Sequence, residues 1–169
     1  RYTQLKRSWN GNLALNAYLR IFLVQAVLAW VIALPIVIVN QAEPRPLDWL
    51  ALVGGLVWLI GFALEAIGDQ QLRTFVSDPK HRGKLMDSGL WRYSRHPNYF
   101  GELTQWWGIF IIALSTPMGW IGFIGPLTLT ILILFISGIP LNEKRQTAKL
   151  GWQEYKRRTS SLVPLPPKK

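Results

Sequence analysis

The 169-residue sequence contains no cysteine and only two histidines. Without cysteine, the chain cannot form a disulfide scaffold, hold an iron–sulfur cluster or bind zinc through thiolates. A histidine-rich metal site is excluded as well, because such a site needs more than two histidines. Charged residues are scarce, at 17% against roughly 25% in typical soluble proteins. Half of the residues are apolar, which excludes intrinsic disorder and disfavours an ordinary soluble domain.

Four stretches are apolar enough, or nearly so, to cross a membrane. A hydrocarbon core about 30 Å thick requires roughly 20 apolar residues in a helix, and the backbone in lipid must satisfy its own hydrogen bonds. The predicted spans cover residues 18–39, 47–68, 99–115 and 118–140, and Pro35 and Pro126 can kink the first and the last of them. The sequence therefore predicts an all-α membrane helix bundle, residues 1–169, with about four transmembrane helices in two hairpins. An amphipathic cytoplasmic helix is expected to follow the last span.

Positive charge alternates with these spans. Residues 1–20, 69–98 and 141–169 carry net charges of +4, +3 and +6, whereas the short links at 40–48 and 116–117 carry −1 and 0. The positive-inside rule then places both termini and the central loop in the cytoplasm. This predicts an integral membrane protein of a bacterial inner membrane or of the endoplasmic reticulum, in contact with lipids. A nucleic-acid partner is disfavoured, since its basic patch would not alternate with apolar spans.

Glu65, Asp69 and Arg73 share one helix face at the cytoplasmic end of the second predicted span, because they are spaced i, i+4 and i+8. An acid in or near hydrocarbon costs about 2–3 kcal/mol, so it is expected to face a polar cavity or a partner. The alternative is an internal ion pair between Asp69 and Arg73 that ends the helix.

A second polar group surrounds Pro97. Proline is tolerated in the first turn of a helix, so a helix is predicted to begin here with His96 near its N-cap. Asn98, Glu102 and Gln105 then lie on one face of the third span. Such polar groups have no reason to face lipid, which favours a functional role.

Arg95 and His96 precede the positive end of this helix dipole, a place suited to anions such as phosphate. The alternative is an interfacial anchor, with Trp91, Tyr93 and Tyr99 in an aromatic belt and the arginines paired to lipid phosphates. The basic tail leaves the same choice open. Lys156, Arg157 and Arg158 either bind anionic headgroups or close over a cofactor phosphate.

The string from Asp87 to Glu102, DSGLWRYSRHPNYFGE, resembles the signature of the DUF1295 family of membrane proteins. That family is related to steroid 5α-reductases and more distantly to sterol reductases. The stretches EAIGDQQLR from Glu65 and GIPLNEKR from Gly138 also fit. Family members carry further helices ahead of the position of Arg1, so the chain is expected to be the C-terminal part of a longer reductase.

The core Arg-His-Pro-x-Tyr-x-Gly also resembles that of isoprenylcysteine carboxyl methyltransferases and phospholipid methyltransferases, which bind S-adenosylmethionine. Asn98, and Glu102 directly after the glycine, favour the reductases. Methyltransferases tend to carry a paired Glu-Glu after their last span, whereas Glu143 here is followed by Lys144. A methyltransferase using S-adenosylmethionine remains the alternative, and a non-catalytic membrane scaffold is the second one.

The resemblance implies an enzyme that adds a hydride from NADPH to a carbon–carbon double bond of a lipophilic enone or steroid-like substrate, with no metal. It places the nicotinamide at Asn98 and Glu102, and the cofactor phosphates and ribose near Arg95, His96 and Tyr99. Glu102 and Tyr99 are the catalytic candidates. The full cofactor-binding set it implies is Glu65, Asp69, Arg73, Tyr93, Arg95, His96, Asn98, Arg157 and Arg158.

Overall fold

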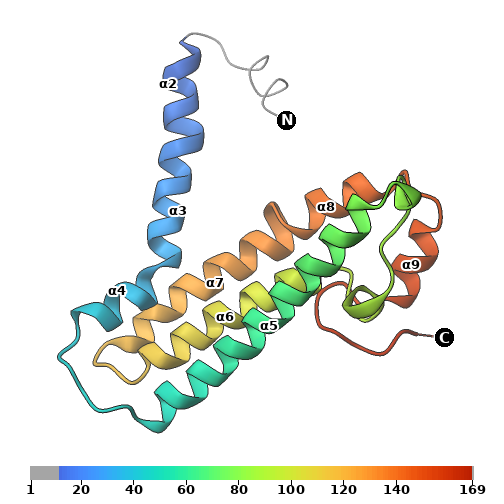
Figure 1. Ribbon diagram of the computed structural model, residues 1–169. Helices are drawn as coiled ribbons and strands as arrows, with labels where there is room; N and C mark the ends of the chain where they lie inside the picture. Colours follow the sequence, from blue (N-terminus) through green and yellow to red (C-terminus); the bar gives the residue numbers. More distant parts are fainter. Residues whose placement is uncertain (1–11, 169) are drawn as a thin grey trace.

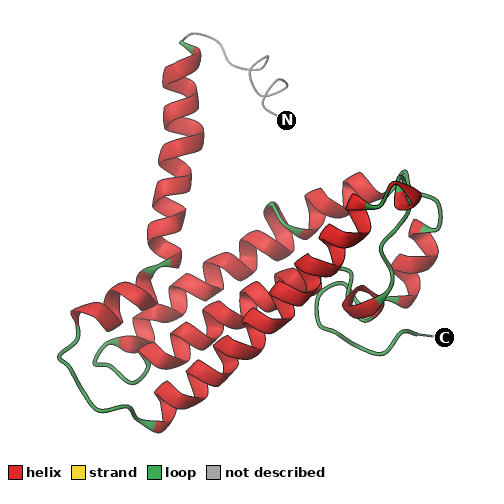
Figure 2. Ribbon diagram, in the orientation of Figure 1, coloured by secondary structure: helices red, strands yellow, loops and turns green. Residues whose placement is uncertain are grey.

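The computed structural model describes residues 12–168, and every regular element in this part of the chain is helical (Figures 1 and 2). One isolated β-bridge between Ser94 and Ser160 is the only extended pairing among these residues. The all-helical prediction is therefore confirmed for the described residues. The basic residues expected to hold the N-terminus in the cytoplasm, Arg1, Lys6 and Arg7, lie outside the described residues.

The N-terminal helix is a continuous rod built from α2 (Leu13–Ala17), a π-helical turn (Tyr18–Leu23) and α3 (Val24–Ile32). Its first turn is capped by Asn12, whose side chain accepts hydrogen bonds from the backbone N–H groups of Ala14 and Leu15. The stretch Ala14–Ile32 is long and apolar enough to cross a membrane, and none of it is buried within the protein. Figure 1 shows this rod projecting from the remaining helices.

The predicted first span, 18–39, is interrupted. α3 ends at Ile32, and α4 (Leu34–Gln41) continues in a new direction with Pro35 in its first turn (Figure 1). Proline lacks a backbone N–H and its ring clashes with the preceding turn, so the kink expected at Pro35 is present. Pro35 is fully buried beside Gly122 and Gly125. The expected first hairpin does not form, because α3 packs against α7 instead of α5.

The closest pair of helices is α5 (Trp49–Ser77) with α6 (Pro97–Ala113), which lie side by side in Figure 1. Gly54 faces Gly108 and Gly61 faces Gly101, and a Cβ atom added at any of these four would lie within 2.7 Å of backbone or side-chain atoms of the other helix. We call these four residues the glycine seam. Small residues at such a contact let helix backbones approach closely.

The fourth predicted span, 118–140, falls within the helical stretch Gly119–Gln146, which is long and apolar enough to cross a membrane. It comprises a 3₁₀ turn (Gly119–Phe123), α7 (Ile124–Ile131), a π-helical turn (Leu132–Ile136) and α8 (Ile139–Gln146). Pro126 is buried in the first turn of α7, where the helix accommodates it. The core joins this stretch to α6 through Leu103, Leu129, Ile133 and Ile139.

Among the described residues, three helices meet the length and composition needed to cross a membrane: Ala14–Ile32, Trp49–Ser77 and Gly119–Gln146. The predicted third span, 99–115, coincides with α6, which has 17 residues. That is shorter than the roughly 20 residues of a full crossing, so the count of four remains a prediction. The last described elements are α9 (Trp152–Arg158) and an extended proline-rich segment that runs to residue 168.

Candidate functional site

The glycine seam brings a group of polar side chains on α5 and α6 into contact. Asn98 donates a hydrogen bond from Nδ2 to Oδ1 of Asp69 at 2.9 Å. Further into the bundle, Gln105 donates from Nε2 to the carboxylate of Glu65. We call Glu65, Asp69, Asn98, Glu102 and Gln105 the interhelical polar cluster. Each acid on α5 is thus paired with an amide on α6, which stabilises a charge that lipid would not.

Glu102 lies between the two amides on the same face of α6, and it is half-buried. The negative charges of Glu65 and Asp69 both act on it. The alternative ion pair between Asp69 and Arg73 does not occur, since Asp69 is bonded to Asn98 and Arg73 is exposed. The structure therefore brings Glu65, Asp69, Asn98 and Glu102 together and leaves Arg73 outside.

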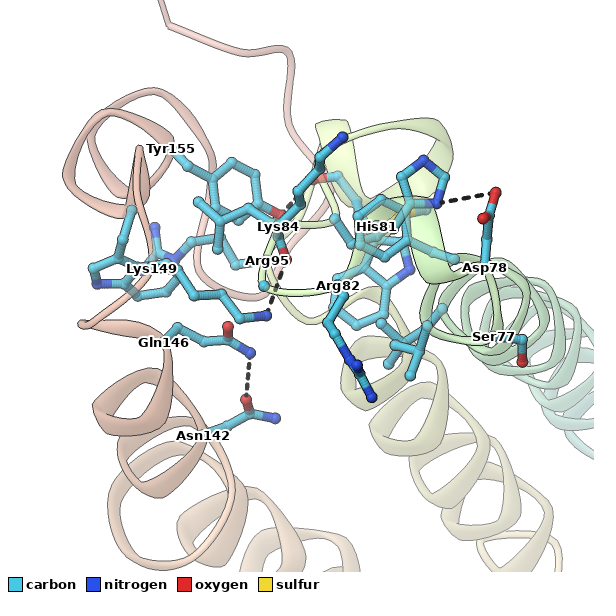
Figure 3. Close-up of a pocket in the computed structure, with 18 of the residues that line it drawn as sticks. Ser77, Asp78, His81, Arg82, Lys84, Arg95, Asn142, Gln146, Lys149 and Tyr155 are labelled. Atoms are coloured by element: carbon cyan, nitrogen blue, oxygen red, sulfur yellow. Dashed lines mark hydrogen bonds and ion pairs between the residues drawn. The ribbon is translucent and has the colours of Figure 1, made fainter.

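A cavity of about 610 Å³ opens at the end of the bundle away from α4, between the loop after α5 and the α8–α9 region (Figure 3). Among the described residues that line it, six belong to basic residue types, and they are His81, Arg82, Lys84, Arg95, His96 and Lys149. The acidic side chain among the lining residues is Asp78. Aromatic walls come from Phe75, Trp91, Trp152 and Tyr155. We call this space the basic cavity.

Lys84 and Lys149 approach one another across the basic cavity in Figure 3, where Nζ of Lys149 donates to the backbone carbonyl of Lys84 at 3.1 Å. On the α8 side, Gln146 donates to Oδ1 of Asn142 at 3.5 Å, and both side chains face the opening. The cavity is thus bordered by cations and amides, which are groups that bind anionic and hydrogen-bonding ligands.

His96 caps α6 between the two regions, next to the polar cluster in sequence and in the wall of the basic cavity. It is only 3% exposed, and its ring stacks on Tyr99 at a centroid distance of 5.2 Å. Burial lowers the pKa of His96 to about 4, although the nearby carboxylate of Glu143 opposes this shift. Neither ring nitrogen has a hydrogen-bond partner among the described residues. His96 is therefore neutral at pH 7.

Arg95 also lines the cavity, but its guanidinium is occupied by protein groups. Nε and Nη2 contact Oε1 of Glu143 at 2.8 and 2.7 Å, and Nη1 donates to the backbone carbonyls of Lys156 and Thr159. The guanidinium carbon lies 6.0 Å from the ring centroid of Trp152. Arg95 is thus a link between α8 and the C-terminal segment.

The loop before α6 is tied to both sides of the site. Trp91 is buried and donates from Nε1 to the carbonyl of Gly68 on α5 at 3.1 Å. Tyr155 on α9 donates its hydroxyl hydrogen to the carbonyl of Trp91 at 2.6 Å. Burial raises the pKa of Tyr155 well above its ordinary value, so its hydroxyl stays protonated as a donor. These bonds fix the loop between α5 and α9.

Three other predicted site residues, Tyr93, Arg157 and Arg158, lie apart from both regions. Tyr93 is 42% exposed, and its carbonyl accepts a hydrogen bond from the backbone of Leu165 in the tail. Arg157 pairs with Glu154 one turn away on α9, and Arg158 pairs with Asp87 at 2.6 Å. None of these side chains lines the basic cavity. Tyr99 is half-buried, and its hydroxyl accepts a 3.4 Å hydrogen bond from Asn142.

Sequence reasoning missed most of the residues that line the cavity. In the sequence, Arg82 and Lys84 stand out only as charged residues of a loop. Nothing in the sequence distinguishes Asn142, Gln146 and Lys149 from ordinary residues of a basic tail at a membrane surface. Glu143 was noted for its sequence pattern, not as a partner of Arg95. Among the described residues, no group of three or more histidine, aspartate or glutamate side chains is placed to hold a metal ion.

Comparison with known proteins adds curated relatives and a family. The chain is 34% identical over 77 residues to the Bos taurus protein 3-oxo-5-alpha-steroid 4-dehydrogenase 1, which is 43% of this chain and 30% of that protein. The Mus musculus and Rattus norvegicus proteins of the same name are each 32% identical over 72 residues, 40% of this chain and 28% of theirs. No solved structure matches the chain significantly. The family model described as "Protein of unknown function (DUF1295)" matches residues 1–159, and the chain therefore belongs to the DUF1295 family.

Proposed function

We propose that the protein is a membrane-embedded reductase that uses NADPH to reduce a carbon–carbon double bond of a lipophilic enone or steroid-like substrate. Support comes from the partial similarity to proteins named 3-oxo-5-alpha-steroid 4-dehydrogenase 1. The matched segment spans less than a third of those proteins, so the substrate and the complete reaction are part of the proposal. The single observation that carries it is a basic cavity whose wall includes His96, the N-cap of the same helix whose first turns carry Asn98 and Glu102 of the interhelical polar cluster.

The residues present fit a dinucleotide. The cavity volume of about 610 Å³ lies within the range of about 300–1,000 Å³ typical of small-molecule sites. Arg82, Lys84 and Lys149 supply cations for phosphate oxygens, and they have no carboxylate partner among the described residues. Gln146 and the ring of Trp152 offer an amide and an aromatic face for the rest of the nucleotide.

NADPH supplies a hydride when it is bound. Asn98 and Glu102 are proposed to orient the nicotinamide end, and Asp69 fixes the rotamer of Asn98 through their hydrogen bond. Glu102 and Tyr99 are the proposed catalytic residues, which would move the proton that follows the hydride. Glu65 holds Gln105 and completes the cluster. Arg95, His96 and Tyr93 belong to the proposed cofactor-binding region, with Arg73, Arg157 and Arg158 at its periphery.

The proposal includes four crossings, with α6 as the short fourth one and the basic cavity on the cytoplasmic side. The basic residues of 69–98 and 141–169 flank that cavity, which agrees with the positive-inside rule. In this orientation the N- and C-termini are cytoplasmic, and α9 lies at the inner membrane surface. Lipids cover the apolar faces, such as that of Ala14–Ile32.

The test compares nucleotide binding by the whole chain in detergent micelles, using NADPH, NADH and S-adenosylmethionine in separate thermal melts. A ligand at 100 times its dissociation constant adds about 2.7 kcal/mol of apparent stability. We expect NADPH to raise the melting temperature and S-adenosylmethionine to leave it unchanged. Stabilisation by S-adenosylmethionine alone would replace the reductase with the methyltransferase, and no response to any nucleotide would favour the scaffold.

Variants then separate the two ends of the proposed cofactor site. Asn98→Ala and Glu102→Gln are each expected to weaken NADPH binding at least tenfold, which corresponds to about 1.4 kcal/mol. Lys149→Ala is expected to weaken it through lost phosphate contacts, more strongly at low salt. Lys144→Ala is the matched control, because Lys144 is an exposed lysine on α8 that does not line the cavity. Normal binding by both the Asn98 and Glu102 variants would refute their assigned roles.

A further inference from the structure

Glu143 is an acidic residue of α8 whose side chain is only 13% exposed and is surrounded by basic groups. Its Oε1 accepts a hydrogen bond from Nε of Arg95 at 2.8 Å and forms an ion pair with Nη2 of Arg95 at 2.7 Å. Nζ of Lys156 lies 3.4 Å from Oε2, and Nε2 of His96 lies 3.6 Å from Oε1. A carboxylate in this environment is held by charge-assisted bonds, which are the strongest hydrogen bonds available to it.

Arg95, which is held by Glu143, also binds the C-terminal segment. Its Nη1 donates to the carbonyls of Lys156 and Thr159 at 3.0 and 2.5 Å, and its backbone N–H donates to the carbonyl of Ser160 at 2.8 Å. Ser94 adds a hydrogen bond from Oγ to the carbonyl of Leu162 at 2.6 Å. The tail after α9 is therefore attached to the residues that precede α6.

The segments joined in this way are the walls of the basic cavity. α8 and the turn after it contribute Asn142, Gln146 and Lys149, and α9 contributes Trp152 and Tyr155. Glu143 itself does not line the cavity. It lies directly beside Asn142, so a change in its bond to Arg95 alters where α8 stands relative to α6 and α9.

We propose that Glu143 is a positioning residue for the basic cavity. By holding Arg95 it fixes α8, the start of α6 and the C-terminal segment in one arrangement, and so sets nucleotide affinity without touching the ligand. The affinity part of this inference rests on the proposed NADPH site. The part that concerns the arrangement of the cavity walls does not rest on NADPH binding, because amide exchange measures it separately.

The experiment uses the whole chain in detergent and compares Glu143→Gln, Glu143→Asp and Glu154→Gln. Glu154 is the matched control, since it is an exposed acid on α9 whose ion pair is with Arg157. We expect Glu143→Gln to raise the dissociation constant for NADPH at least tenfold. Amide exchange at Arg95 and Leu165, whose N–H groups donate to Ser160 and Tyr93, should become faster. Glu143→Asp should recover part of both properties, and Glu154→Gln should match the unmodified protein.

Because Glu143→Gln leaves a buried guanidinium without its carboxylate, that variant could fail to fold. The double variant Arg95→Met with Glu143→Leu removes both charges together and is expected to fold. It lacks the donors to Lys156 and Thr159, so its tail amides should also exchange faster and its NADPH affinity should fall. A folded Glu143→Gln or double variant with unmodified affinity and unmodified exchange would overturn the proposal.

The two proposals fail in different ways. If the unmodified protein does not bind NADPH, the proposed function fails, and amide exchange alone then decides the role of Glu143. If the unmodified protein binds NADPH but Glu154→Gln weakens binding as much as Glu143→Gln does, the positioning role fails and the NADPH site stands.

Discussion

The interhelical polar cluster and the cluster around Glu143 both hold carboxylates within the packed protein, but they do so with different partner groups. In the first, the two acids of α5 are paired with amides of α6, Asp69 with Asn98 and Glu65 with Gln105, at a contact set by glycines. In the second, Glu143 is met by an arginine and a lysine from segments distant in sequence. The first depends on how closely two helices approach. The second depends on whether a loop, a helix and the tail assemble at all.

The difference shows how each cluster is specified. A helical spacing of three or four residues places Asn98, Glu102 and Gln105 on one face before any tertiary contact forms. No such local rule brings Arg95 to Glu143, which lies 48 residues further along the chain. The helix pair is therefore sensitive to steric changes at its contact, and the Glu143 cluster is sensitive to changes of charge.

The largest expected effect comes from breaking the glycine seam. In Gly61→Ala, the added Cβ would lie 2.6 Å from the backbone nitrogen of Gln105 and 2.7 Å from the carbonyl oxygen of Gly101, so the helices must separate. We expect a loss of about 3 kcal/mol of stability. Gly55→Ala is the control, because no atom outside its own helix lies within 4 Å of its added Cβ. Thermal melting in detergent measures both, and equal melting temperatures would mean that the close approach is unimportant.

The second expected effect concerns pH and acts on the Glu143 cluster through His96. The pKa of His96 is about 4 in the folded protein and 6.5 in the unfolded chain, because burial beside Arg95 opposes protonation more than Glu143 favours it. The unfolded chain therefore binds more protons between these values, and stability is lost as the pH falls from about 6.5 to about 4. The full loss is about 3 kcal/mol.

His96→Gln isolates this contribution from that of carboxylates titrating in the same range. Melting temperatures of the two proteins are compared at pH 7 and pH 4.5. We expect the variant to lose less stability on acidification than the unmodified protein does. Parallel losses would show that His96 is protonated as readily in the folded protein as in the unfolded chain.

The smallest expected effect concerns the loop before α6, which lies between the two clusters. Trp91→Phe removes the hydrogen bond from Nε1 to the carbonyl of Gly68 while it keeps an aromatic ring in a buried position. We expect a loss of about 1–2 kcal/mol, from one buried hydrogen bond and a small cavity. Trp120→Phe is the control, because Trp120 is 65% exposed. Chemical denaturation of both variants would show whether the tether contributes more than an exposed tryptophan does.

Much of the architecture follows from local rules that the sequence displays. The α6 helix begins at Pro97 with His96 as its N-cap, as the sequence predicts, because proline fits only the first turn of a helix. The break at Pro35 was predictable for the same reason. The new direction of the chain after it was not, since that direction depends on how Pro35 packs beside Gly122 and Gly125. The first hairpin was predicted wrongly because a short link does not force two helices to pack together.

In the candidate site, too, some features follow from sequence spacing and others depend on tertiary contacts. Sequence spacing alone placed Glu65 and Asp69 on one helix face and Asn98 and Glu102 on another, but not the pairing of Asp69 with Asn98 instead of Arg73. Arg157 and Arg158 were expected at the cofactor phosphates, whereas they pair with Glu154 and Asp87 outside the cavity lining. Long basic side chains reach several partners, so their contacts cannot be deduced from position in the chain.

The sequence by itself determined that this chain is helical and apolar, where α6 begins, and which polar residues share a helix face. These properties depend on composition and on the 3.6-residue helical repeat, which act between near neighbours. Only the tertiary structure decided that Glu143 holds Arg95, that Lys149 and Lys84 meet across a cavity, and that α3 packs against α7 instead of α5. Those contacts join segments far apart in the chain, and they exist only once helix packing has fixed the distances between them.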